Sequence, residues 1–74
     1  MFTMKYRTIG TNILLYRKQK GYTQEELAQK AGISTGYLGQ IERGNKGKSF
    51  AMDTLFQIAD ALGVEPEDLT KNKI

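Results

Sequence analysis

The stretch that decides the fold of this chain runs from Thr23 to Gly44 and reads TQEELAQKAGISTGYLGQIERG. It opens with a T-x-x-E pattern, in which the Thr23 hydroxyl is placed to accept a hydrogen bond from the amide of Glu26 and the Glu26 carboxylate to accept one from the amide of Thr23. Such a reciprocal pair begins a helix. Gly32 is placed to end this helix in a left-handed turn, and Ser34 can cap a second one. The stretch therefore predicts helices over residues 24–31 and 35–43, joined so tightly that they cross steeply.

Hydrophobic periodicity predicts further helices on both sides of this stretch. Before it, apolar residues recur at helical spacing from about Thr8 until Gly21 ends the pattern. After it, a helix is expected from about Ala51 to Leu62, followed by a short last helix with Pro66 at its first position. The chain is therefore expected to be all-α, a compact five-helix bundle. The stripe of the fourth helix expected to face the core consists of Met52, Leu55, Phe56, Ile58, Ala59 and Leu62.

The chain divides into an arm, one domain and a tail. Residues 1–7 alternate apolar and polar side chains, a pattern that fits either a strand-like arm or a disordered leader. Residues 8–70 form the expected domain, and residues 71–74 form a tail expected to fray. Leu14 and Leu15 lie off the apolar stripe of the first helix, so they are expected to contact the arm, the last helix or a partner chain.

The composition limits the classes of function. At 74 residues with a net charge of +3, the chain is long enough for one small domain, and it has no cysteine or histidine to form disulfides or metal sites. No apolar run approaches the ~18 residues of a membrane span and no signal-peptide core is visible, so a cytoplasmic location is expected. Met1 to Gln24 contains basic residues and no acid. This asymmetry suits a protein that presents a basic face to a polyanion, although solvated lysines would give the same pattern.

The run RKQKGYTQEELAQKAGIS, followed by YLGQIERG, resembles the helix-turn-helix family of lambda repressor and Cro, the XRE family of small bacterial and phage repressor domains. The resemblance covers roughly Ile9 to Leu69. It implies a bundle of the lambda repressor DNA-binding-domain type, in which residues 24–31 and 35–43 form the helix-turn-helix. The second of these helices is expected to enter the major groove of DNA.

The outward face of the 35–43 helix carries the residues expected to read the bases. Small and amide side chains leave this face nearly free of charge, whereas a surface helix with no binding role commonly carries Glu and Lys. Glycine lets a helix lie deep in the groove, an amide can pair bidentately with adenine, and threonine can contact a thymine methyl group. The alternative is that the glycines are tolerated or pack against the preceding helix. The expected base-contacting residues are Thr35, Gly36, Gly39 and Gln40.

Phosphate contacts are expected around this face. In the family that the chain resembles, the glutamine matching Gln24 contacts the DNA backbone, and a helix N-terminus favours an anion. The same resemblance implies an ion pair between Arg17 and Glu42 that links the first helix to the third, so both are assigned a structural role. The expected phosphate-contacting residues are Gln24, Tyr37, Arg43, Asn45, Lys46 and Lys48.

These residues predict a sequence-specific, double-stranded DNA-binding transcriptional regulator, either a repressor or a controller. Because one short helix reads too few base pairs, a homodimer is expected on a palindromic operator with half-sites about 34 Å apart. A phage or plasmid repressor, a restriction-modification controller and an antitoxin all fit this description.

The alternative is a protein-interaction module, such as an antitoxin or a partner-binding bundle, in which the apolar residues Phe2, Leu14, Leu15 and Phe50 bind another protein. No constellation of residues for acid-base, nucleophilic or metal chemistry is visible in the sequence. Enzymatic activity, a small-molecule substrate, a cofactor and a metal are therefore not expected.

Overall fold

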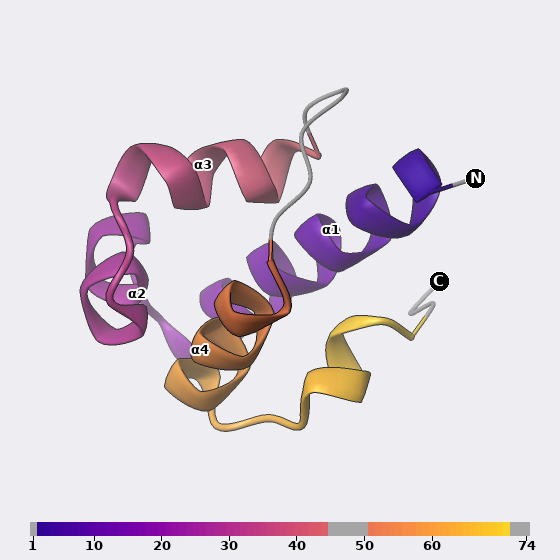
Figure 1. Cartoon of the computed structure of the whole chain (residues 1–74). Helices are drawn as coiled ribbons and strands as arrows, with labels where there is room; N and C mark the ends of the chain where they lie inside the picture. Colours follow the sequence, from indigo (N-terminus) through magenta and orange to yellow (C-terminus); the bar gives the residue numbers. More distant parts are fainter. Residues whose placement is uncertain (1, 45–50, 72–74) are drawn as a thin grey trace.

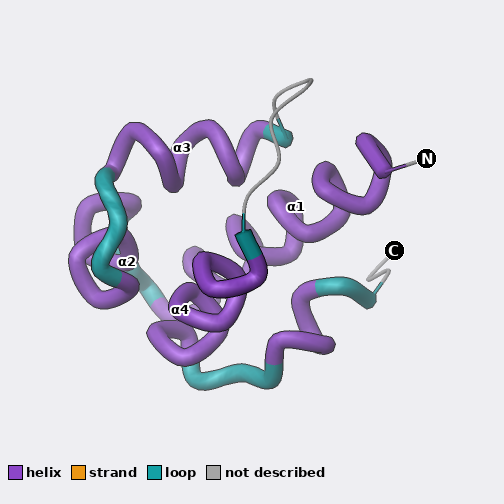
Figure 2. The backbone as a smooth tube through the Cα atoms, in the orientation of Figure 1, coloured by secondary structure: helices purple, strands orange, loops and turns teal. Residues whose placement is uncertain are grey.

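The computed structural model describes residues 2–44 and 51–71, which form helices around one core (Figure 1). This part of the chain contains four α-helices, one 3₁₀ helix and no strand, so the all-α class is confirmed (Figure 2). None of these described helices is long and apolar enough to cross a membrane. The elements are α1 (Phe2–Lys20), α2 (Gln24–Ala31), α3 (Thr35–Arg43), α4 (Met52–Leu62) and η1 (Pro66–Leu69).

The last helix of the expected five-helix bundle is a single 3₁₀ turn rather than an α-helix. The amide of Thr70 donates to the carbonyl of Glu67 at 3.0 Å, three residues back instead of four. Pro66 has no amide hydrogen, and the four residues of η1 are too few for α-helical hydrogen bonds to repeat. The expected acidic start is present, because the Asp68 carboxylate accepts from the amide of Glu65 at 3.1 Å. The described bundle therefore has four α-helices, not five.

Residues 2–7 belong to a helix rather than to an arm. α1 starts at Phe2 and continues to Lys20, so the helix start expected near Thr8 was too late. No proline interrupts it, and Gly10 costs only about 1 kcal/mol relative to alanine, which packing can offset. The alternation over residues 1–7 is too short to specify a strand without a neighbouring strand to pair with.

Every helix contributes apolar side chains to the core. α1 lies against α3, α2 lies against both α3 and α4, and η1 lies against α1 and α4. This arrangement buries the apolar side of each element while leaving the opposite side in contact with solvent. The largest fully buried side chains are Ile13, Leu27, Leu38, Ile58, Leu62 and Leu69.

The expected core stripe of α4 was too wide. Leu55 and Ile58 are buried as expected, but Met52 is 62% exposed and Phe56 is 49% exposed. Met52 and Phe56 are four residues apart and lie together on one side of the helix, at the edge of its buried face. The apolar stripe in the sequence is therefore broader than the strip that the other described elements cover.

α1 crosses α3 where the backbones leave no room for a side chain. Gly10 is buried in α1, and a Cβ atom added to it would overlap the carbonyl oxygen of Ile41 and lie 3.2 Å from that of Glu42. Gly44 ends α3 with a φ of 62°, and a Cβ atom there would lie 2.8 Å from Cγ of Arg7. Both glycines thus allow α1 to rest directly on the C-terminal end of α3.

A buried asparagine ties α1 to the segment after η1. Asn12 is 2% exposed, and its Nδ2 donates to the carbonyl oxygens of Leu69 at 2.8 Å and Lys71 at 2.6 Å. These bonds satisfy carbonyl groups that the single turn of η1 cannot satisfy itself. In the sequence, the only signal for this role of Asn12 is that a polar residue stands next to the core position Ile13.

Candidate nucleic-acid interface

Side-chain caps fix how α2 and α3 meet. The Thr23 hydroxyl accepts from the amide of Glu26 at 3.0 Å, and the Glu26 carboxylate accepts from the amide of Thr23 at 2.8 Å. Ser34 caps α3 by accepting from the amide of Tyr37 at 3.1 Å. Between the helices, Gly32 has a φ of 75°, a left-handed conformation that suits glycine. The caps and the turn expected from the sequence are therefore confirmed.

α3 lies along one edge of the molecule (Figure 1). Its inner side places Leu38 and Ile41 in the core. On its outer side Thr35 and Gly36 are exposed, and nothing lies within 4 Å of the position that a Cβ atom of Gly36 would take. Gln40 is half-buried beside them. These three residues form the outward face that the sequence predicts.

Gly39 and Tyr37 are less exposed than Thr35 and Gly36. Gly39 is buried, because its Cβ position lies 3.4 Å from Nη1 of Arg43 and 3.8 Å from the carboxamide atoms of Gln24. A glycine has no side chain to keep these longer neighbours away from it. Tyr37 is half-buried and packs against the core. Gly39 is therefore covered by the side chains of Arg43 and Gln24, and its contact with a base stays a prediction.

The expected ion pair between Arg17 and Glu42 is present, and Gln24 extends it. Arg17 donates to the two carboxylate oxygens of Glu42, from Nε at 2.7 Å and from Nη2 at 3.2 Å. Gln24 Nε2 donates to Glu42 Oε1 at 2.9 Å, and Arg17 Nη1 donates to the carbonyl of Tyr22 at 2.9 Å. The side chains of Arg17 and Glu42 are 10% and 3% exposed. The negative charge of the Glu42 carboxylate is thus balanced by Arg17 and would not repel a polyanion bound near α3.

The structure brings only some of the predicted phosphate-contacting residues together. The side chain of Gln24 is held against α3 by its hydrogen bond to Glu42. Arg43 is exposed at the C-terminal end of α3, with its guanidinium directed back toward Gly39. The predicted contacts Asn45, Lys46 and Lys48 lie outside the described residues.

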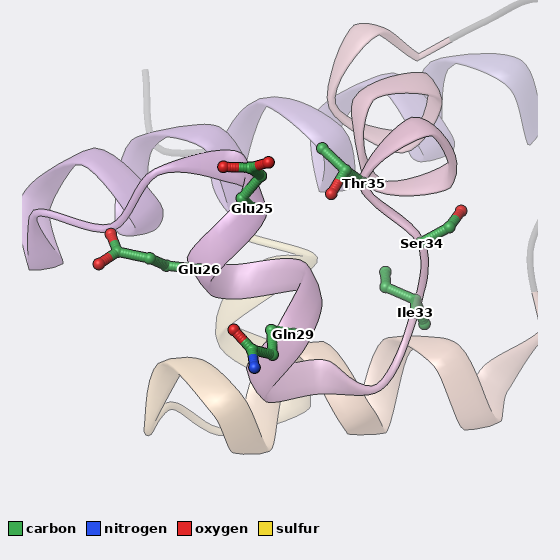
Figure 3. A pocket seen from close by; sticks show the side chains of 6 residues that line it. All are labelled: Glu25, Glu26, Gln29, Ile33, Ser34 and Thr35. Carbon is green, nitrogen blue, oxygen red and sulfur yellow. The ribbon is translucent and has the colours of Figure 1, made fainter.

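A polar hollow of about 570 Å³ lies between α2 and the start of α3 (Figure 3). Two of its residues, Glu26 and Ser34, already serve as helix caps. The described residues contain no group of His, Cys, Asp or Glu side chains that could hold a metal ion. The hollow accordingly results from the crossing of α2 and α3. Its glutamates, Glu25 and Glu26, make the surface beside the start of α3 acidic. It is lined by Glu25, Glu26, Gln29, Ile33, Ser34 and Thr35.

The chain matches known proteins over most of its length. A sequence profile of the helix-turn-helix family matches residues 13–69. YazB from Bacillus subtilis, an uncharacterized HTH-type transcriptional regulator, is 45% identical over 60 residues, which cover 81% of this chain and 84% of YazB.

Solved structures agree with this match. The restriction-modification controller protein C.AhdI from Aeromonas hydrophila superposes with a TM-score of 0.80 at 31% identity, over 86% of this chain and 94% of C.AhdI. SinR, the master regulator for biofilm formation, crystallised in complex with DNA, superposes with a TM-score of 0.77 at 40% identity, over 85% of this chain and 98% of the SinR chain. These proteins are regulators or controllers, and SinR was crystallised with DNA.

Proposed function

Because the chain belongs to the helix-turn-helix family, whose members include transcriptional regulators, we propose that it binds double-stranded DNA sequence-specifically and regulates transcription. The observation that carries the proposal is the outer face of α3, where Thr35 and Gly36 are exposed beside Gln40. Glu42, at the end of the same helix, is neutralised by Arg17 and therefore does not repel phosphates. The major groove, about 12 Å wide, admits one α-helix of this kind.

Different residues supply specificity and affinity in this function. Thr35, Gly36 and Gln40 contact base edges, whereas Gln24 and Tyr37 at the margin of the face contact phosphates. Phosphate contacts release counterions, so the affinity falls steeply with salt concentration. Asn45, Lys46 and Lys48, which lie outside the described residues, add further phosphate contacts.

A homodimer follows from the length of α3. Its nine residues extend for roughly 13 Å at 1.5 Å per residue, which corresponds to about four base pairs. So short a site recurs too often to specify an operator. Two copies of the protein therefore bind a palindromic operator, with their α3 helices about 34 Å apart in successive major grooves. This role places the protein in the cytoplasm, as a repressor or controller.

One experiment tests the proposal directly. The purified protein is mixed with random-sequence duplex DNA, and the bound fragments are recovered and sequenced. A recovered palindrome with half-sites separated by one helical turn is the expected result. Recovery of no preferred sequence, together with undetectable binding to random duplex at low salt, would overturn the proposal.

The alternative function is binding of a partner protein. Leu15, Met52 and Phe56 are apolar side chains left exposed by the bundle, whereas Leu14 is half-buried and Phe50 lies outside the described residues. A monomer in solution without affinity for duplex DNA would favour this alternative over the DNA-binding function.

Replacing Gln40 with alanine is expected to relax the preference at one or two base positions, because the amide that can pair with adenine is lost. Replacing Lys46 with alanine is expected to weaken binding to all sequences alike, since a phosphate contact carries no sequence information. Sequencing of bound fragments and titrations with selected and random duplexes measure the two effects. Unchanged DNA affinity in both variants would contradict the proposed interface.

Replacing Gly36 with alanine is expected to separate stability from binding. The free energy of unfolding should rise by about 0.5 to 1 kcal/mol, because alanine favours the helix and the space around the new methyl group is open. DNA affinity should fall, because the methyl group keeps α3 from the floor of the groove. Thermal melting and a binding titration measure the two quantities, and undiminished affinity would show that Gly36 does not approach DNA.

A further inference from the structure

We propose that Arg43 reads a guanine base from the major groove, although its place at the end of α3 suggests a phosphate contact. This inference rests on the proposed DNA-binding function and assigns a specificity-determining role to one residue of the same interface. It is carried by the path of the Arg43 side chain, the glycines beneath that path, and the absence of a carboxylate partner among the described residues.

The position of Arg43 on α3 places it in the middle of the outward face. Residues three, four and seven apart lie on one side of an α-helix, so Arg43 shares a side with Gly36, Gly39 and Gln40. Gly36 is exposed with open space around it, and Gly39 has no side chain of its own. A long side chain at position 43 is therefore free to extend along this face.

The guanidinium takes that path. Its Nη1 lies 3.4 Å from the Cβ position of Gly39, one helical turn nearer the N-terminus of α3. Helical side chains lean toward the N-terminus because each Cα–Cβ bond is tilted that way. A larger residue at position 39 would occupy this space. The charged group therefore lies over the centre of the face that meets the groove floor, and not beyond its end, where the phosphates pass.

The guanidinium is also available for a ligand. Within the described part of the chain, ion pairs join Arg17 to Glu42 and Lys71 to Asp68, so Arg43 takes part in neither. The neighbouring Glu42 already accepts hydrogen bonds from Arg17 and Gln24. A planar guanidinium donates two parallel hydrogen bonds to O6 and N7 of guanine, a pattern that no other base offers in the major groove.

Two variants test the inference. Arg43→Ala removes both the planar guanidinium and its charge, whereas Arg43→Lys keeps the charge but has no planar group to donate two parallel hydrogen bonds. Fragments bound by the unaltered protein are expected to share a guanine in each half-site, and fragments bound by Arg43→Ala should vary at that position only. The affinity of Arg43→Ala for the selected duplex should fall roughly 5- to 150-fold, with a much smaller fall for random duplex. Arg43→Lys should keep the salt dependence of binding but lose most of the guanine preference.

Other outcomes would overturn the inference. If Arg43→Ala weakened selected and random duplexes by the same factor and reduced the slope of log affinity against log salt by about one per protomer, Arg43 would contact a phosphate. An unchanged guanine preference in both variants would also refute it. Both results differ from failure of the proposed function, in which the unaltered protein itself would select no sequence. Melting temperatures close to that of the unaltered protein would verify that the variants are folded.

Discussion

Replacing Arg17 with alanine is expected to lower the free energy of unfolding by about 3 to 5 kcal/mol, because one partner of a buried, hydrogen-bonded ion pair is removed. Glu42 would retain its charge at 3% side-chain exposure and would lose two of its hydrogen bonds. The carbonyl of Tyr22 would lose its donor as well. At roughly 4 °C or more per kcal/mol for a domain of this size, the melting temperature should fall by at least ~12 °C.

Lys18 provides the control for this prediction. It is the next residue in α1, carries the same charge and is exposed, so Lys18→Ala should change the free energy of unfolding by less than about 0.5 kcal/mol. Both variants are measured by thermal melting and by denaturant titration at one salt concentration. Equal melting temperatures for the two would refute the structural role of the pair.

Replacing Gly10 with alanine is expected to destabilise the fold, although alanine is the better helix former. The new methyl group would overlap the carbonyl oxygen of Ile41, a backbone atom that no side-chain rotation can move aside. α1 would have to move away from α3, and overpacking of this kind costs typically about 1 to 3 kcal/mol. The melting temperature should fall accordingly, and DNA affinity should fall with it because α1 supports the end of α3.

The matched control is the same substitution at Gly36, which lies in a helix but faces open space. The Gly10→Ala variant should melt at a lower temperature than the unaltered protein, whereas the Gly36→Ala variant should melt at a higher one. A shift of both melting temperatures in the same direction would show that the crossing of α1 and α3 is not closely packed at Gly10.

Local signals in the sequence were sufficient for the central helices. The caps at Thr23 and Ser34 join groups only three residues apart, so their chemistry can be read from a short window. The glycine turn at Gly32 depends on one residue's conformational freedom. The pairing of Arg17 with Glu42 spans distant positions, and it was expected only because the chain resembles a family in which that pair occurs.

The sequence by itself thus determined where α2 and α3 begin and end, since the hydrogen bonds that cap a helix are local. Only the tertiary structure decided that Gly10 meets a carbonyl of α3, that Phe56 stays exposed, and that Arg43 lies over a buried Gly39. Each of these depends on the distance between atoms brought together by the packing of helices or by the path of one side chain. Residue types alone do not specify those distances, because the same glycine or phenylalanine suits a crowded site and an open one equally well.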